Sequence, residues 1–338
     1  MLNLSMLLED SARRHPDRDA VVLGDTRLSY AQVNAMASQV ANLLVSRGIR
    51  PGDKVALSCP NLPYFPVIYY GILKAGAVVV PLNVLLKGRE IAYHLGDAEA
   101  KAYFCFQGTP DLPMGDEGKK GFDAADGCEH FFLVMADPSA PASVEGAETL
   151  GQALQGQSPE LEPVTTAETD TAVILYTSGT TGQPKGAELS HSNLVMNAVT
   201  CNRLFGADAT FHERHLLTLP LFHSFGSTVQ MNAGFSVGAT LVLLPRFDAE
   251  QAVALLDKEE ITFFAGVPTM WWGLLGALDG SGADVKKIAA NLRIAVSGGA
   301  SLPVEIIKQV KERFGVTVLE GYGLSETSPV ATFSDPER

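Results

Sequence analysis

The residues best suited to chemistry lie in one short run, 176–186, which reads Tyr-Thr-Ser-Gly-Thr-Thr-Gly-Gln-Pro-Lys-Gly. Glycines let a backbone turn tightly and present its N–H groups, hydroxyl side chains add donors, and a lysine adds positive charge. Such a run predicts a loop that binds a polyphosphate. The residues expected to bind it are Thr177, Ser178, Gly179, Thr180, Thr181, Gly182 and Lys185.

This loop is not the common nucleotide-binding loop. Counting from Gly179, Pro184 and not glycine precedes Lys185, so a kinase-like or GTPase-like interpretation fails. The alternative is a flexible Ser/Thr/Gly linker. It is disfavoured because an apolar strand directly precedes the run and Pro-Lys-Gly closes it.

A second run, 320–327, reads Glu-Gly-Tyr-Gly-Leu-Ser-Glu-Thr. Gly321 and Gly323 leave space around Tyr322, whose ring could stack on a purine. Glu326 offers the hard oxygen ligand that Mg²⁺ prefers. A glycine-rich hairpin with one exposed glutamate is the alternative interpretation.

Two further segments are weaker signals on their own. His223, within 219–226, could orient a carboxylate or offset negative charge, although a histidine beside phenylalanine is usually structural. The run 295–300, Ala-Val-Ser-Gly-Gly-Ala, would let a flat ring approach the backbone, but a simple strand-to-helix turn has the same pattern.

Taken together, these segments resemble the adenylate-forming enzymes, the family that includes acyl- and aryl-CoA synthetases, firefly luciferase and the adenylation domains of peptide synthetases. The resemblance covers nearly the whole chain and is strongest to bacterial fatty-acid–CoA ligases. It implies catalytic roles for Lys185, His223 and Glu326, with Glu326 also holding Mg²⁺. It adds Gly299, Ala300, Glu320, Gly321, Tyr322 and Ser325 to the ATP-binding residues, and it implies that His223, Phe225, Gly298, Gly321, Gly323 and Leu324 bind the acid substrate. Ser325 stands where the family usually has threonine, so the hydroxyl is kept.

The implied activity is that of an AMP-forming acid–thiol ligase. A carboxylate attacks the α-phosphorus of Mg-ATP, pyrophosphate leaves, and coenzyme A takes the acyl group. Medium- or long-chain fatty acids are the expected substrates. An amino acid is disfavoured, because His223 stands where peptide synthetases carry an acidic partner for the ammonium. An acyl-AMP ligase that loads a carrier protein and a non-catalytic nucleotide- or acyl-adenylate-binding module are the alternatives.

Family members continue with a ribose-binding aspartate, a hinge and a small domain that carries a catalytic lysine. None of these follows Glu326 before the polar end at Arg338, which reads as a severed loop. The resemblance therefore implies the large N-terminal domain alone, with the small C-terminal domain absent. Weak binding of ATP or acyl-adenylate and little complete ligase activity are expected of it.

The elements that must position these residues follow an α/β rhythm. Strands are expected at 54–58, 77–80, 130–135, 171–176, 216–219, 240–244, 262–264 and 292–296, and helices at 29–47 and 62–75. Glycine, proline and acidic residues predict a surface connection over 107–170, apart from the strand at 130–135. We expect α/β subdomains with helices covering β-sheets, the first over 1–165 and the second over 166–338.

Composition and net charge limit the classes of molecule that the protein is expected to bind. Hydrophobic residues make up 46% and the net charge is −13, which favours a folded protein and disfavours nucleic acid and anionic membranes as partners. No run has membrane-spanning length, and the N-terminus lacks the basic start of a signal peptide. Scattered cysteines fit a cytoplasmic location. The expected partners are a small carboxylic acid and ATP; a homodimer is left open.

Overall fold

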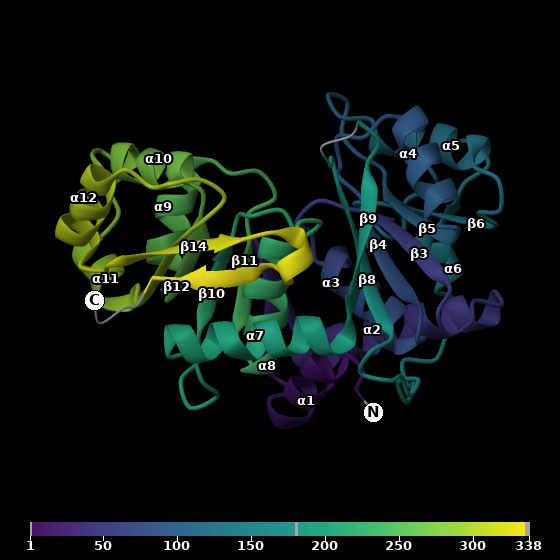
Figure 1. The fold of residues 1–338 in the computed structure, drawn as a ribbon, viewed down its shortest axis with the longest axis horizontal. Coiled ribbons are helices and arrows are strands. Elements are labelled where there is room, and N and C mark those ends of the chain that lie inside the picture. The colour runs from purple at the N-terminus through teal and green to yellow at the C-terminus, as the bar shows by residue number, and fades with distance from the viewer. Residues whose placement is uncertain (1, 180–181, 335–338) are drawn as a thin grey trace. The chain divides into compact units, whose positions relative to one another are not determined.

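The computed structural model describes residues 2–179 and 182–334, and the chain forms two compact units. The first comprises Met1–Glu9 and Ala31–Leu194, and the second Asp10–Tyr30 and Val195–Arg338. Each unit has its own sheet with helices packed on it, which confirms the expected α/β class (Figure 1). The domain division expected at residue 165 stays a prediction. Within 2–179 and 182–334, no helix is both long and apolar enough to cross a membrane.

The sheet of the first unit has the strand order β7-β6-β5-β3-β4-β8-β9 over the described residues. Its strands are β3 (Lys54–Ser58), β4 (Val78–Pro81), β5 (Ala100–Phe106), β6 (His130–Val134), β7 (Glu148–Thr149), β8 (Thr171–Thr177) and β9 (Lys185–Ser190), and its helices are α2 (Tyr30–Ser46), α3 (Tyr64–Lys74), α4 (Gly88–Asp97), α5 (Met114–Ala124) and α6 (Leu150–Ala153). All neighbouring strands are parallel except the β8–β9 hairpin. Continuous apolar runs such as Val78–Pro81 suit parallel strands that are buried on both faces.

The expected surface connection over 107–170 is wrong, because it contains α5, β7 and α6. Helix α5 lies beside α4, as Figure 1 also shows. Gly121 lets the two helices approach, because a Cβ on it would lie 2.5 Å from the Ile91 side chain of α4. Gly118 lets α5 pack on the sheet, because a Cβ on it would lie 2.5 Å from Cys105 Sγ of β5. Glycine usually weakens a helix, so the local sequence did not predict α5, which tertiary packing stabilises.

The sheet of the second unit has the order β15-β14-β13-β12-β10-β11-β1-β2 in the described part of the chain. Its strands are β1 (Asp19–Leu23), β2 (Thr26–Ser29), β10 (Arg214–Leu217), β11 (Thr240–Leu243), β12 (Phe263–Gly266), β13 (Ile294–Ser297), β14 (Val318–Gly323) and β15 (Val330–Phe333). Its helical segments are α7 (His191–Phe205), the π-helix η1 (Phe225–Asn232), α8 (Ala233–Ser236), α9 (Ala249–Lys258), α10 (Pro268–Leu278), α11 (Val285–Asn291), α12 (Val304–Phe314) and the 3₁₀ turn η2 (Ser325–Thr327), and α1 (Met6–Arg14) precedes β1.

A large apolar core covers one face of this second sheet. Phe264 and Ala295, which are partners in the β12–β13 register, face Trp271 of α10 and residues of α9, α11 and α12. The fully buried Trp271 donates its indole N–H to the Val296 carbonyl at 3.2 Å. Because β10 to β14 run parallel, their carboxyl ends all reach the same edge of the sheet.

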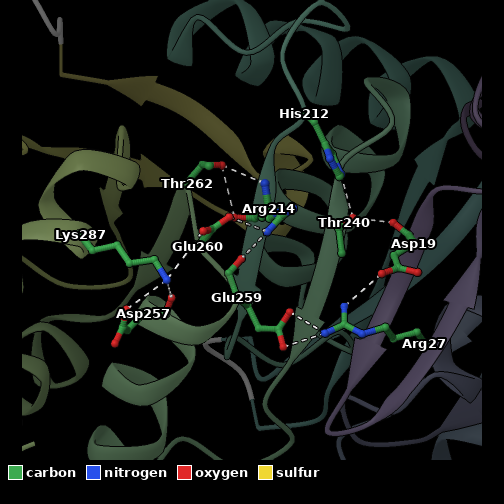
Figure 2. Close-up of polar contacts among 10 residues, drawn as sticks. All are labelled: Asp19, Arg27, His212, Arg214, Thr240, Asp257, Glu259, Glu260, Thr262 and Lys287. Atoms are coloured by element: carbon green, nitrogen blue, oxygen red, sulfur yellow. Dashed lines mark hydrogen bonds and ion pairs between the residues drawn. The ribbon is translucent and has the colours of Figure 1, made fainter. Parts of the chain in front are cut away.

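The opposite edge, at the amino ends of these strands, carries a network of charged and hydroxyl side chains (Figure 2). Arg27 forms a two-pronged ion pair with Glu259 at 2.9 Å, and Arg214 lies 3.3 Å from Glu260. His212 contacts Thr240 Oγ1 at 2.9 Å, and burial lowers the pKa of His212 to about 4. The pairs satisfy one another, which fits a structural role for this edge.

Candidate functional site

The polyphosphate-type loop connects the two strands of the β8–β9 hairpin in the first unit. Thr177, the last residue of β8, is paired with Lys185, the first residue of β9. Gly179 and Gly182 have φ angles of +56° and +99°, a region that favours glycine, so the glycines are needed for this turn. Thr180 and Thr181 lie outside the described residues, and their expected role stays a prediction.

The described part of the loop is open to solvent. Ser178, Gly179, Gly182, Gln183 and Lys185 are exposed, and the Lys185 ammonium has no ion-pair partner among residues 2–179 and 182–334. An exposed lysine beside a glycine- and hydroxyl-rich turn can receive an anion without first breaking an internal ion pair.

A cavity of about 280 Å³ lies in the second unit, where the carboxyl ends of β13 and β14 meet the start of η1. Open α/β sheets commonly bind ligands at the carboxyl ends of their strands. The residues that line it are His223, Ser224, Phe225, Gly298, Gly299, Gly321, Tyr322, Gly323, Leu324, Ser325, Pro329, Val330 and Phe333.

Glycines form the flat part of the cavity wall. A Cβ on Gly298 would lie 2.9 Å from the Phe225 ring and 3.3 Å from the Gly321 carbonyl oxygen. A Cβ on Gly321 would lie 2.5 Å from the ring of Phe333. These separations are below ordinary van der Waals contact, so a side chain at either position would displace an aromatic wall.

His223 lies at the mouth of this cavity, directly before η1. Its side chain is exposed, yet the surrounding protein lowers the pKa of the imidazole because the nearby walls desolvate the cation. The backbone N–H of Phe225 points to His223 Nδ1 at 3.5 Å, a long contact that favours a proton on the other ring nitrogen. The neutral ring can thus offer an Nε2–H donor at the cavity mouth.

The hairpin between β14 and β15 supplies the other side of the mouth. Tyr322 is 65% exposed and Leu324 is 50% exposed, so both present apolar surface to a ligand and not to the core. Asn197 of α7 fixes the hairpin, because its amide donates to the Thr327 and Val330 carbonyls at 3.2 and 3.0 Å. Glu326 is exposed and makes no ion pair within the described part of the chain.

Of three further residues expected to bind ATP, one lines the cavity and two do not. Gly299 lines the cavity, whereas Ala300 and Glu320 are not among its lining residues. A carboxylate oxygen of Glu320 accepts the Leu302 N–H at 2.8 Å and so ties β14 to the turn that enters α12. An ATP contact by Ala300 or Glu320 stays a prediction.

The structure thus brings together His223, Phe225, Gly298, Gly299, Gly321, Tyr322, Gly323, Leu324 and Ser325 around one cavity. Sequence reasoning missed Ser224, Pro329, Val330 and Phe333. Phe333 follows the second motif, and only its antiparallel pairing with Gly321 reveals its place. Gly321 has no side chain and so leaves room for a close neighbour, which is the one signal in the sequence that could have indicated Phe333. Convergence of Lys185 and Glu326 on one triphosphate stays a prediction.

The described residues contain no group of three or more His, Cys, Asp or Glu side chains that could hold a metal ion by themselves. Mg²⁺ bound with a nucleotide needs only one or two protein carboxylates, because phosphates and water supply the other ligands. The exposed Glu326 fits that arrangement.

The chain is similar to known proteins over nearly its full length. A family model described as AMP-binding enzyme matches residues 8–338. The long-chain-fatty-acid–CoA ligase of Bacillus subtilis (strain 168) is 32% identical over an alignment 359 residues long. The alignment covers 97% of this chain and 60% of the relative. The chain therefore spans about 60% of the length of that relative.

Solved structures give the same result. The anthranilate CoA ligase AuaEII in complex with anthranoyl-AMP has a TM-score of 0.87 and 26% identity, covering 99% of this chain and 62% of that one. The inhibitor-bound N-terminal domain of FACL13 from Mycobacterium tuberculosis has a TM-score of 0.85 and 30% identity, covering 100% and 79%. These matches confirm the expected N-terminal-domain fold and the resemblance on which the site residues were chosen.

Proposed function

The chain belongs to the AMP-binding enzyme family. We propose that this chain binds ATP and acyl-adenylate and that, together with the small domain that the resemblance implies, it activates a carboxylic acid as an acyl-adenylate and then passes the acyl group to coenzyme A. The observation that carries the proposal is the cavity at the carboxyl ends of β13 and β14. It joins a neutral histidine, an exposed tyrosine and a flat glycine wall. The exposed loop before Lys185 adds a second anion-binding feature.

In the first half-reaction a substrate carboxylate oxygen forms a bond to the α-phosphorus of ATP, and the bond from that phosphorus to the bridging oxygen of pyrophosphate breaks. The loop amides and Lys185 would hold the triphosphate, and His223 would orient the carboxylate through its Nε2–H. Glu326 would hold Mg²⁺, which neutralises charge on the phosphates and on the departing pyrophosphate. No covalent bond to the protein is required.

In the second half-reaction the thiol sulfur of coenzyme A bonds to the acyl carbon, AMP leaves, and the thiol proton passes to solvent. Tyr322 would stack on the adenine in both steps, since its ring is exposed beside the cavity. Positioning of the reacting groups and neutralisation of the charge on the departing AMP would supply the rate enhancement in this acyl transfer.

We propose a medium- or long-chain fatty acid as the substrate. Phe225, Leu324, Val330 and Phe333 give the cavity apolar walls, and the lining residues that the structure describes include no carboxylate to pair with an amino-acid ammonium. The Bacillus subtilis relative is a long-chain-fatty-acid–CoA ligase. AuaEII, which binds anthranoyl-AMP, makes aryl acids the competing class.

The test is pyrophosphate release by the full-length protein with MgATP and a panel of acids: acetate, hexanoate, decanoate, palmitate, benzoate and an amino acid. We expect the highest kcat/KM with decanoate or palmitate. Preference for benzoate would overturn the fatty-acid assignment but keep the reaction. Release with none of the acids would overturn the reaction itself.

Variants then test the residues. Lys185→Met, His223→Ala and Glu326→Gln should each lower kcat/KM by about 10²-fold or more, as removal of one transition-state contact does in other enzymes. Lys308→Met, which removes an exposed lysine on α12, is the matched control and should leave the rate unchanged. Equal activity of Lys185→Met and Lys308→Met would refute the role of the loop lysine.

A further inference from the structure

Helix α4 contacts the phosphate-type hairpin at both ends of its loop. The hydroxyl of Tyr93 donates a hydrogen bond to the Pro184 carbonyl at 2.8 Å. The hydroxyl of Tyr176 donates to Asp97 Oδ2 at 2.7 Å. Tyr93 and Asp97 are four residues apart on α4, so they lie on one face of the helix.

These two contacts lie on either side of residues 177–183, which include every expected triphosphate-binding residue of the hairpin except Lys185. Tyr176 precedes Thr177, and Pro184 precedes Lys185. The chain between them is the segment expected to hold the triphosphate, and it makes no other side-chain hydrogen bond within the residues described. Its two ends are therefore held by one helix, while Ser178 and Gly182 between them are exposed.

The hairpin needs such support because of its place in the sheet. Strand β9 is the edge strand, and the described sheet registers β8 with β4 at Val173, four residues before Thr177. The loop-proximal end of the hairpin therefore consists of two strands, and two strands alone are marginally stable. Gly186, the register partner of Tyr176, has no side chain; a Cβ there would lie 2.6 Å from Ile174 and 3.5 Å from the Tyr176 ring. The glycine thus lets Ile174 of β8 lie close to β9 at this register position.

A buried histidine packs these contacts together. His94 of α4 meets the Tyr176 ring edge to face, with centroids 4.4 Å apart, and the Tyr93 ring at 5.5 Å. Its Nδ1–H donates to the Glu90 carbonyl at 2.6 Å, which fixes the ring on the helix. Burial, and secondarily the Asp97 carboxylate, raise the pKa of Tyr176, so its phenol keeps the proton that it donates.

We propose that Tyr93 and Asp97 are positioning residues that hold the two ends of the phosphate loop in the geometry that receives the triphosphate. The proposal rests on the proposed function for the identity of the ligand. Tyr93 contacts the backbone carbonyl of Pro184, and Asp97 acts through Tyr176, so neither bonds to a residue that is itself expected to bind the triphosphate. A preorganised loop spends less binding energy on ordering, so nucleotide affinity is the property that these contacts set.

The test uses Tyr93→Phe and Asp97→Ala in the full-length protein. The first change removes the donor hydroxyl, and the second removes both oxygens that could accept from Tyr176. Steady-state kinetics should show the KM for MgATP raised about 3- to 10-fold in each variant, the change that one lost hydrogen bond produces. The KM for the acid should be unchanged. The melting temperature should fall by no more than the matched controls show. Asp97→Glu, which keeps the acceptor, should restore part of the ATP affinity.

Two controls remove similar groups elsewhere in the first unit. Tyr64→Phe removes a tyrosine hydroxyl that donates to the Ala136 carbonyl at 3.4 Å, and Asp123→Ala removes an exposed carboxylate paired with Lys119 on α5. Both should leave the KM for MgATP unchanged. If Tyr64→Phe raises it as much as Tyr93→Phe does, the effect is general destabilisation and the proposal fails.

Amide hydrogen exchange of residues 182–187, measured without any nucleotide, tests whether Tyr93 and Asp97 anchor the loop, and this test does not depend on activity. Exchange there should be at least about 5-fold faster in Tyr93→Phe and Asp97→Ala than in the two controls, because local opening becomes easier when an anchor is lost. Unchanged exchange together with unchanged MgATP affinity would overturn the proposal. Faster exchange in a protein that never binds MgATP would support the anchoring and overturn the proposed function instead.

Discussion

Lowering the pH should destabilise the second unit in part through His215, and replacing this one residue should remove its share of that sensitivity. His215 of β10 is 1% exposed and stacks on Phe263, with ring centroids 4.3 Å apart and planes 21° apart. Neither of its ring nitrogens has a hydrogen-bond partner of acceptable geometry in the described part of the chain. Burial lowers the pKa of His215 to about 3, although the nearby Gln230 backbone opposes the shift.

The sign follows from where the proton binds. An unfolded chain takes up a proton on this histidine below about pH 6.5, whereas the folded chain does not until about pH 3. Stability is therefore fully present above pH 6.5 and is lost progressively as the pH falls towards 3. One proton changes the free energy of unfolding by about 1.4 kcal/mol per pH unit, so His215 costs about 2 kcal/mol at pH 5 relative to neutral pH.

The assay compares melting temperatures of the wild type and His215→Phe at pH 7.5 and pH 5. Phenylalanine keeps the stack on Phe263 and removes the titrating group. The melting temperature of the wild type should fall further than that of the variant by about 4 to 8 °C, the shift that about 2 kcal/mol produces in a unit of this size. His191 and His212, whose pKa values burial lowers to about 4, contribute equally to both proteins, so their effects cancel in the comparison.

Phe263→Leu is the matched control, because it disturbs the same stack without removing a titratable group. Its melting temperature should fall below that of the wild type by a similar amount at both pH values. An equal pH-dependent fall in the wild type and in His215→Phe would refute the reasoning, since it would place the proton uptake elsewhere.

Three further substitutions test the site and its support. Gly298→Ala should raise the KM for the acid at least about 10-fold and change the KM for MgATP less, because the added Cβ would lie 2.9 Å from the Phe225 ring. An unchanged KM for the acid would show that this wall does not bind the acid. Asn197→Ala should speed hydrogen exchange over 325–330 and lower adenylate formation, since two carbonyls lose their donor; unchanged exchange would contradict it. Glu9→Gln should lower stability by about 3 kcal/mol in denaturant titrations, because the fully buried Lys74 loses its charged partner, and Lys74→Met in the same background should recover part of the loss; an additive second loss would refute the pairing.

The sequence by itself determined the local chemistry of this protein. The glycines and hydroxyls of 177–182 specify a tight turn because few residues adopt positive φ angles, and Gly179 and Gly182 do so. Strands such as Lys54–Ser58 and Val78–Pro81 could be predicted because β-branched apolar runs bounded by turn residues favour one conformation. The motifs were distinctive enough to predict the family.

Tertiary structure alone decided how distant segments complete one another. Phe333 enters the cavity wall through its pairing with Gly321, and Tyr93 reaches Pro184 across 91 residues of sequence. Helix α5 forms despite its glycines because close packing on α4 outweighs their weak propensity. Such contacts depend on side chains that meet only after the sheets have formed, and local periodicity carries no information about which distant residue will lie opposite.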